Sequence, residues 1–231
     1  MSRNHAFMVD LARRFKAPPQ RLLDFGCGRG EIVELAVDAG YDAYGTDTYD
    51  GKWSSTLADV DRVKVATPDR IPFDDGTFDI VITNQVLEHV RDLEITVSEL
   101  ARVLKIGGTL IASMPTSESV WEAHVKAFFP HWFARGSAAE SICLRINHAM
   151  LPAGKPPIAK YLSGGSEYLR KQVFYRSLRD YIATLNGSFV LVSEEEKRWL
   201  GDRMGVSVPS FLAKTITRRV ASCVLVFEKS H

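Results

Sequence analysis

The chain has 231 residues, of which 45% are hydrophobic and 25% are charged, a composition typical of one folded body with a substantial core. Its 29 Lys and Arg residues nearly balance 28 Asp and Glu residues, and the formal net charge of +1 gives no general field to attract nucleic acid. The longest apolar runs, such as residues 220–227, are far shorter than the roughly 20 residues that a membrane-spanning helix needs.

The cysteines and the N-terminal residues bear on the compartment. Residues 1–14 mix charged with apolar side chains and lack the apolar core of a signal peptide. Cys27, Cys143 and Cys223 are odd in number and far apart, without the paired spacing of a zinc site or a disulfide framework. We therefore expect reduced thiols, a cytoplasmic protein and no metal site.

Helix and strand patterns alternate through the first half of the chain. Apolar residues recur every three to four positions in the helical segments, and the strand at 78–83 is largely apolar, as buried parallel strands are. In chain order, the predicted elements are a helix at 7–15, a strand at 21–25, a helix at 31–39, strands at 41–46, 63–66 and 78–83, a helix at 93–104 and a strand at 109–114. This alternation predicts an α/β fold with a doubly wound, mostly parallel sheet.

The alternation stops after Pro115. Residues 116–186 contain aromatic, basic and Gly/Pro-rich pieces, which predict an insertion within a single domain spanning 1–231. The expected pieces are turns at 154–157 and 163–166, a helix at 167–185 and two closing strands at 189–193 and 220–227. The insertion is a candidate substrate-binding lid.

The strongest local motif is a glycine-rich turn between a strand and a helix. Gly26, Gly28 and Gly30 follow the strand at 21–25 and allow a ligand to approach the backbone closely. About 20 residues later, Asp47 ends the next strand, where a carboxylate can accept hydrogen bonds from ribose hydroxyls. The turn alone is equally compatible with a structural role, but together the two features favour a nucleoside cofactor.

Four ordered motifs carry a resemblance to a known family. Residues 24–30 (DFGCGRG) resemble motif I of the class I S-adenosylmethionine (SAM)-dependent methyltransferases. Residues 71–79 (IPFDDGTFD), 86–90 (VLEHV) and 102–110 (RVLKIGGTL) are similar to later motifs of its small-molecule, type 11-like branch. The resemblance covers about residues 20–115 and implies a Rossmann-like sheet of seven strands, SAM as cofactor and S-adenosylhomocysteine as product.

The resemblance also implies where SAM lies. Thr67 occupies a position that is usually acidic in this branch, so adenine is held by Thr67, by Asp69 or by backbone groups in this stretch. The implied cofactor residues are Asp24, Gly26, Cys27, Gly28 and Gly30 beside the methionine part, Asp47 and Thr48 at the ribose, Thr67, Pro68 and Asp69 at the adenine, and Asn84, Gln85 and Val86 near the methionine end.

A hydroxyl acceptor benefits from a base, and His has a suitable pKa near neutrality. His89 follows a strand at the ligand-binding edge of the sheet and is the first candidate, with packing of the next helix as its structural alternative. His124, His131 and His148 in the insertion are further candidates. Glu88 is interpreted as a charge at a helix N-terminus.

Two features of the insertion bear on the acceptor. Its aromatic residues favour a buried lid core over a sugar-stacking wall, and its basic residues favour a solvated face over a phosphate site. The aromatic set is Trp121, Phe128, Phe129, Trp132 and Phe133, and the basic set is Arg170, Lys171, Arg176 and Arg179.

The sequence predicts O-methylation of a sugar hydroxyl, because residues 122–133 loosely resemble stretches of glycan-tailoring methyltransferases. A small natural product, a quinone or an acyl-carrier substrate is the alternative acceptor. A non-catalytic SAM-binding module and a nicotinamide-dependent reductase are the rival classes. The reductase is disfavoured because the first half of the chain lacks a Tyr-x-x-x-Lys pair.

Overall fold

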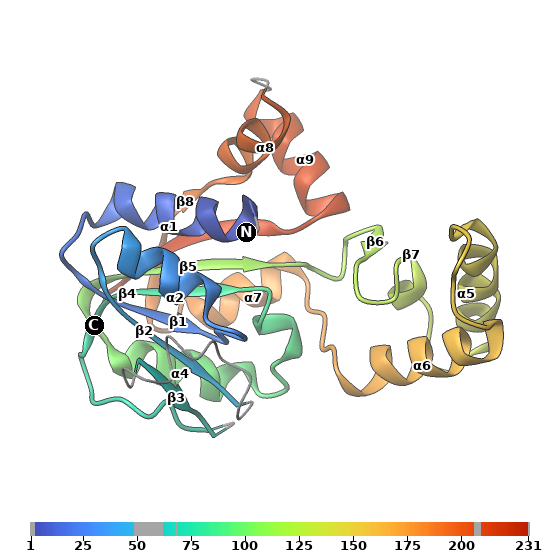
Figure 1. Ribbon diagram of the computed structural model, residues 1–231, viewed down its shortest axis with the longest axis horizontal. Helices are drawn as coiled ribbons and strands as arrows, with labels where there is room; N and C mark the ends of the chain where they lie inside the picture. The colour runs from blue at the N-terminus through green and yellow to red at the C-terminus, as the bar shows by residue number, and fades with distance from the viewer. Residues whose placement is uncertain (1–2, 49–61, 68, 206–208, 231) are drawn as a thin grey trace.

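The computed structural model describes residues 3–48, 62–67, 69–205 and 209–230. Its centre is a seven-stranded sheet in the order β3-β2-β1-β4-β5-β9-β8 (Figure 1). The strands are β1 (Arg21–Phe25), β2 (Asp42–Asp47), β3 (Val63–Val65), β4 (Phe78–Asn84), β5 (Leu104–Met114), β8 (Phe189–Glu194) and β9 (Cys223–Lys229). Strands β1 to β5 pair in parallel, and β9 is antiparallel to both β5 and β8. The predicted doubly wound, mostly parallel sheet is confirmed.

Helices cover both faces of the sheet because successive strand residues point to opposite sides. Leu22 packs in a cluster with α1 (Arg3–Phe15), α2 (Glu31–Asp38), α8 (Glu196–Met204) and α9 (Ser210–Val220). The adjacent Leu23 packs in a second cluster with α4 (Leu93–Val103) and α7 (Leu178–Leu185). One strand thus contributes to two cores.

The strand order reverses beside β1, which lies between β2 and β4. In open α/β sheets, ligands bind at such a switch point, outside the carboxyl ends of the strands. The loops after β1, β2 and β4 all leave from this edge.

The insertion projects from the same edge of the sheet (Figure 1). It has a small core of its own, which includes Val125, Leu144, Tyr161 and Leu169. Its elements are β6 (Trp121–Glu122), β7 (Ala127–Phe128), the 3-10 turn η2 (Pro130–Trp132), α5 (Ala138–Met150) and α6 (Ile158–Lys171).

The helix predicted over residues 167–185 is wrong, because α6 ends at Lys171 and α7 begins at Leu178. The intervening chain bonds instead to the 3-10 turn η1 (Leu87–His89) and the loop after it. The Phe174 N–H donates to the Glu88 carbonyl at 2.6 Å, and the Arg176 guanidinium donates to the carbonyls of Val90 and Arg91. Tertiary bonding therefore overrides local helix propensity here.

The predicted turn at 163–166 is also wrong, because these residues lie inside α6. Gly165 faces the insertion core there, where a Cβ would stand in ordinary contact at 3.5 Å from Val125 and 3.7 Å from Leu144.

Three further differences concern bounds and missed elements. Strand β5 begins at Leu104 rather than at residue 109, α8 and α9 were not predicted, and residue 220 ends α9 rather than opening β9. None of the helices in the described segments has the length and hydrophobicity that crossing a bilayer requires.

Candidate functional site

The glycine turn after β1 is held by backbone hydrogen bonds and by its neighbours. Gly26 has φ +78°, and a Cβ there would stand 2.3 Å from a Val86 methyl carbon. The Gly28 N–H donates to Asp47 Oδ2 at 2.9 Å, which ties the turn to the end of β2. Gly30, with φ +85°, is the N-cap residue of α2. Side chains larger than hydrogen at Gly26 would fill the space between the loops after β1 and β4.

Asp24 lies directly behind this turn and is 2% exposed. Burial, followed by repulsion from Asp47, raises the pKa of Asp24 to about 8. Asp24, Cys27 and Asn84 are among the residues that line a cavity of about 200 Å³. The amide of Asn4 in α1 fixes Asn84 by donating to its Oδ1 at 2.8 Å.

A larger cavity, of about 610 Å³, lies beside the turn. The Thr67 hydroxyl donates to Asp69 Oδ1 at 2.8 Å, so these two side chains form one polar unit in its wall. Pro68 lies outside the described residues. The predicted residues that line this cavity are Gly26, Asp47, Thr48, Thr67, Asp69, Gln85, Val86 and His89.

Gln85 connects this cavity to a third one, of about 270 Å³, since it lines both. Its backbone has φ +60°, a left-handed conformation that is uncommon outside glycine. The side-chain amide donates to the hydroxyls of Ser113 at 3.2 Å and Ser222 at 2.8 Å. These bonds fix the side chain at the boundary between the cavities.

The structure brings two of the predicted histidines together. The rings of His89 and His124 are 5.0 Å apart, centroid to centroid, and each lines one of the two cavities that share Gln85. His131 packs against the Tyr175 ring and is not among the residues that line these cavities. His148 bonds to the Pro156 carbonyl at 2.8 Å, which indicates a structural role.

The environments of these two histidines differ. Burial lowers the pKa of His89, whose Nδ1 lies 2.6 Å from the Gln172 carbonyl oxygen. Burial is the largest effect on His124 and opposes its charged form, but the hydrogen bond to Glu122 and the charges of Glu122 and Glu88 together outweigh burial and raise the pKa. Of the pair, His89 is thus the stronger candidate for a neutral imidazole.

Glu88 is the functional candidate that sequence reasoning missed. It lies in the first turn of the 3-10 helix η1, and its side chain there is 0% exposed. Burial raises the pKa of Glu88 to about 7. Glu122 was also missed, although its position two residues before His124 was a usable signal.

Residues 23–112 match the family model of a methyltransferase domain. This match and the fold support a class I SAM-dependent methyltransferase. The chain is similar to a probable SAM-dependent methyltransferase of Mycolicibacterium smegmatis, with 32% identity over 41% of the chain and 37% of the relative. It is also similar to a ubiquinone biosynthesis O-methyltransferase of Rhizobium etli, with 30% identity over 51% of each protein. The alignments thus span about half of these relatives or less.

A solved SAM-dependent methyltransferase from Mesorhizobium loti has the same fold as this chain. The TM-score is 0.59 at 16% identity, and the alignment covers 95% of this chain and 96% of that chain. At this level of identity, the likeness concerns the fold, and it extends beyond the residues that the family model matches.

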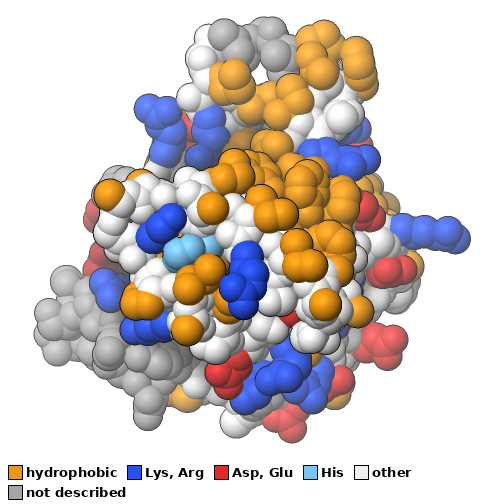
Figure 2. Space-filling model, turned by 90° about the vertical axis from the view of Figure 1, so that its right-hand side faces the viewer, with side chains coloured by type: hydrophobic (Ala, Val, Ile, Leu, Met, Phe, Trp, Pro, Cys, Tyr) orange, Lys and Arg blue, Asp and Glu red, His pale blue; other side chains and the backbone are white. Residues whose placement is uncertain are grey.

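The aromatic set is not a buried lid core. Phe128, Phe129, Trp132 and Phe133 are between 38% and 48% exposed, and the Phe129 and Trp132 rings contact each other at 4.9 Å. Figure 2, which views the molecule from the side of the insertion, shows hydrophobic side chains gathered on that face. The expectation of burial was therefore wrong.

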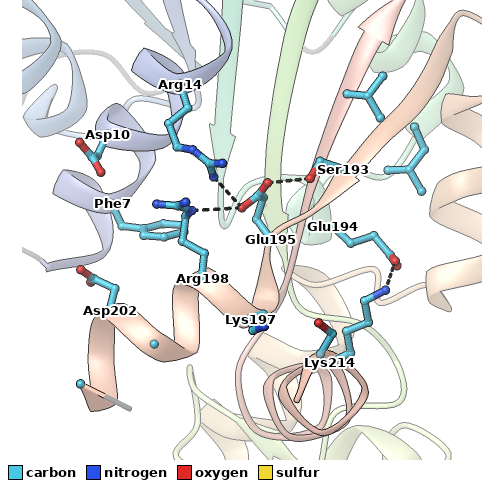
Figure 3. A pocket seen from close by; sticks show the side chains of 15 residues that line it. Phe7, Asp10, Arg14, Ser193, Glu194, Glu195, Lys197, Arg198, Asp202 and Lys214 are labelled. Carbon is cyan, nitrogen blue, oxygen red and sulfur yellow. Dashed lines mark hydrogen bonds and ion pairs between the residues drawn. The ribbon is translucent and has the colours of Figure 1, made fainter. Parts of the chain in front are cut away.

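A cleft of about 1080 Å³, larger than the three cavities at the switch point, lies between α1, β8, α8 and α9. Figure 3 shows that its charged side chains bind one another: Glu195 contacts Arg14 and Arg198, and Glu194 contacts Lys214. None of the residues predicted from the motifs lines it. We therefore assign the functional site to the smaller cavities at the switch point.

Proposed function

We propose that the chain catalyses SAM-dependent methyl transfer to an acceptor hydroxyl and releases S-adenosylhomocysteine. The observation that carries the proposal is the convergence of Asp24, the bare turn at Gly26 and Gly28, and Asp47 at one edge of the sheet. Among the described residues, these groups surround the two adjoining cavities of about 610 and 200 Å³.

The donor groups of the site fit the parts of SAM. Asp47 can accept hydrogen bonds from both ribose hydroxyls. The Thr67–Asp69 pair lies in the same cavity as Asp47 and supplies polar groups for the adenine. Asp24 lies in the adjoining cavity, where its carboxyl can accept a hydrogen bond from the ammonium group of the methionine part and where that cation would favour its ionised form. We propose that the other cofactor residues implied by the motifs contact SAM at the parts named for them in the sequence analysis.

Methyl transfer needs alignment more than it needs acid or base strength, because SAM has a neutral leaving group. The acceptor oxygen forms a bond to the methyl carbon while the S–C bond breaks. The electron pair of the broken S–C bond stays on sulfur, which becomes a neutral thioether. The hydroxyl proton must also leave. We propose that this occurs at the His89–His124 pair, which lies where the two cavities that share Gln85 meet.

The proposed acceptor is a sugar hydroxyl, bound in the cavity of about 270 Å³. Two indoles, Trp121 and Trp199, and the polar side chains of Asn4, Gln85 and Arg203 line this cavity. Apolar ring faces combined with hydrogen-bonding groups suit a polyhydroxylated ring. The insertion at 116–186 would then form the acceptor side of a single domain and close over it as a lid.

A phenolic acceptor of the quinone-precursor type is the second candidate. It is favoured by the similarity to a ubiquinone biosynthesis O-methyltransferase. The three free cysteines fit a reducing compartment, so we propose a cytoplasmic location for either activity.

The test is transfer from methyl-labelled SAM to matched panels of nucleotide sugars, oligosaccharides and catechols. We expect labelled sugar, with SAM affinity unchanged and turnover lowered on the order of 10²-fold in His89→Ala. Transfer to catechols alone would exclude the sugar acceptor. SAM binding without transfer to any panel member would instead support a binding module.

A further inference from the structure

Three side chains that can bind a metal ion meet between the cofactor cavity and the acceptor cavity. We call Glu88, His89 and His124 the metal triad. One ligand atom from each lies within 4.8 Å of the other two, and His89 Nε2 is 4.0 Å from Glu88 Oε1. Two come from the turn after β4 and one comes from the insertion. The fold therefore assembles a 2-His-1-carboxylate set from distant parts of the sequence.

Both imidazoles are oriented as metal-bound histidines are. His89 Nδ1 faces the Gln172 carbonyl, which can only accept, so Nδ1 carries the proton. His124 Nδ1 likewise donates to the Glu122 carboxylate at 2.7 Å. The neutral form of each ring therefore has its lone pair on Nε2. A second-shell carbonyl or carboxylate on the far nitrogen is the usual partner of a metal-binding histidine.

The two carboxylates near these rings differ in how they are satisfied. Glu122 accepts from His124, from the Tyr175 hydroxyl at 2.6 Å and from the Val125 N–H at 2.6 Å. Glu88 is fully buried, yet neither of its carboxylate oxygens has a hydrogen-bond partner among the described residues. A buried carboxylate normally needs such a partner or a cation. Glu122 thus acts as a support, and Glu88 retains the capacity to bind an ion.

We propose that the metal triad binds one divalent transition-metal ion of the Zn²⁺ type. Imidazole nitrogens with one carboxylate suit Zn²⁺ and its neighbours better than Mg²⁺ or Ca²⁺, which prefer oxygen ligands. Tetrahedral bonds of about 2.0–2.2 Å put ligand atoms roughly 3.3 Å apart, so the triad would contract by about 1 Å on binding. The sequence predicted no metal site, because the two histidines are 35 residues apart and the cysteines lack zinc spacing.

The proposal deepens the proposed function and rests on it for the role of the ion. Three protein ligands leave a fourth coordination position, which the acceptor hydroxyl would occupy. His124 lines the acceptor cavity, so this position is close to the bound acceptor. A bound Zn²⁺ would lower the pKa of a coordinated hydroxyl, so the proton would leave to solvent water at the His89–His124 pair and the oxygen would attack the SAM methyl carbon. Both histidines would then act on the proton through the ion that they hold.

The test begins with chelator-treated protein titrated with ZnCl₂ in a calorimeter. We expect one ion per chain and a loss of affinity of at least about 100-fold in Glu88→Gln and in His124→Ala. Glu122→Gln, which removes only the support of His124, should weaken binding by roughly 10- to 100-fold. The matched control is His131→Ala, a histidine of the same insertion outside the triad, which should bind Zn²⁺ as wild type does.

Titration with Co²⁺ gives a second readout, because a His2Glu site produces visible ligand-field bands that a nonspecific surface site lacks. Binding of S-adenosylhomocysteine is measured on the same samples to report both folding and the cofactor site. No saturable Zn²⁺ binding by wild type, or binding that survives both triad substitutions, would overturn the metal proposal even if the nucleoside binds. Zn²⁺ binding without nucleoside binding would instead overturn the proposed function, and with it the role assigned to the ion.

Discussion

The replacement Gly26→Ala tests the bare turn on which the cofactor cavity depends. An alanine at φ +78° costs about 1–2 kcal/mol for the left-handed conformation. Its Cβ would also stand 2.3 Å from a Val86 methyl carbon, and overpacking of this kind costs roughly 1–3 kcal/mol. We therefore expect a loss of about 2–5 kcal/mol in the free energy of unfolding.

Three companion variants, namely Gly28→Ala, Val86→Ala and the double variant of Gly26 and Val86, separate these contributions. Gly28 also has positive φ, at +54°, but a Cβ there would meet nothing within 4 Å, so Gly28→Ala should lose only about 1–2 kcal/mol. Val86→Ala removes the methyl groups that clash with a Cβ at residue 26. Gly26→Ala should therefore cost roughly 1–3 kcal/mol less when it is made in the Val86→Ala protein than when it is made in wild type.

The assay is urea unfolding of all four variants and wild type, monitored by tryptophan fluorescence. Equal losses in Gly26→Ala and Gly28→Ala, together with additivity of the Val86 change, would refute the clash between the two loops.

Other expected outcomes concern charge and hydrogen bonding. Asp24 has a pKa of about 8 in the folded chain against 3.8 in the unfolded chain, so the free energy of unfolding should fall as pH rises from about 4 to 8, by at most about 1.4 kcal/mol per pH unit. In thermal melts, Asp24→Asn should lose this pH dependence. If the dependence persists in the variant, Asp24 is not its source. Asp47→Ala should weaken S-adenosylhomocysteine binding by roughly 10- to 1000-fold in calorimetry, since two ribose hydrogen bonds to a charged group are lost; unchanged affinity would remove Asp47 from the ribose. Arg102 donates to Glu99, Asp75 and the carbonyls of Ile71 and Phe73. Arg102→Lys should lower the free energy of unfolding in urea by about 1–3 kcal/mol and leave the affinity for S-adenosylhomocysteine unchanged. A loss of affinity without a loss of stability would contradict this anchoring role.

The first half of the fold was predictable because its signals are local. Helical spacing, apolar strands and the turn at Gly26–Gly30 each depend on neighbours in sequence, and parallel pairing then places Asp24 and Asp47 at one edge. The resemblance of four motifs to one family supplied the cofactor. Boundaries shifted by a few residues, as at the start of β5.

The insertion was less predictable because its structure depends on contacts between distant segments. The break between α6 and α7 arises from bonds that residues 172–177 make with the turn η1. The same docking orients His89, while the insertion brings in His124 and its support Glu122. The sequence indicated that Glu88 is a charge at a helix N-terminus, and only the folded chain reveals its burial.

Calorimetric titration of the purified chain with S-adenosylhomocysteine, alongside NAD, tests the central claim most directly. The account predicts saturable binding of one S-adenosylhomocysteine per chain, competition by SAM and no response to NAD. Binding of NAD in its place, or no binding of either SAM or its demethylated product, would contradict it.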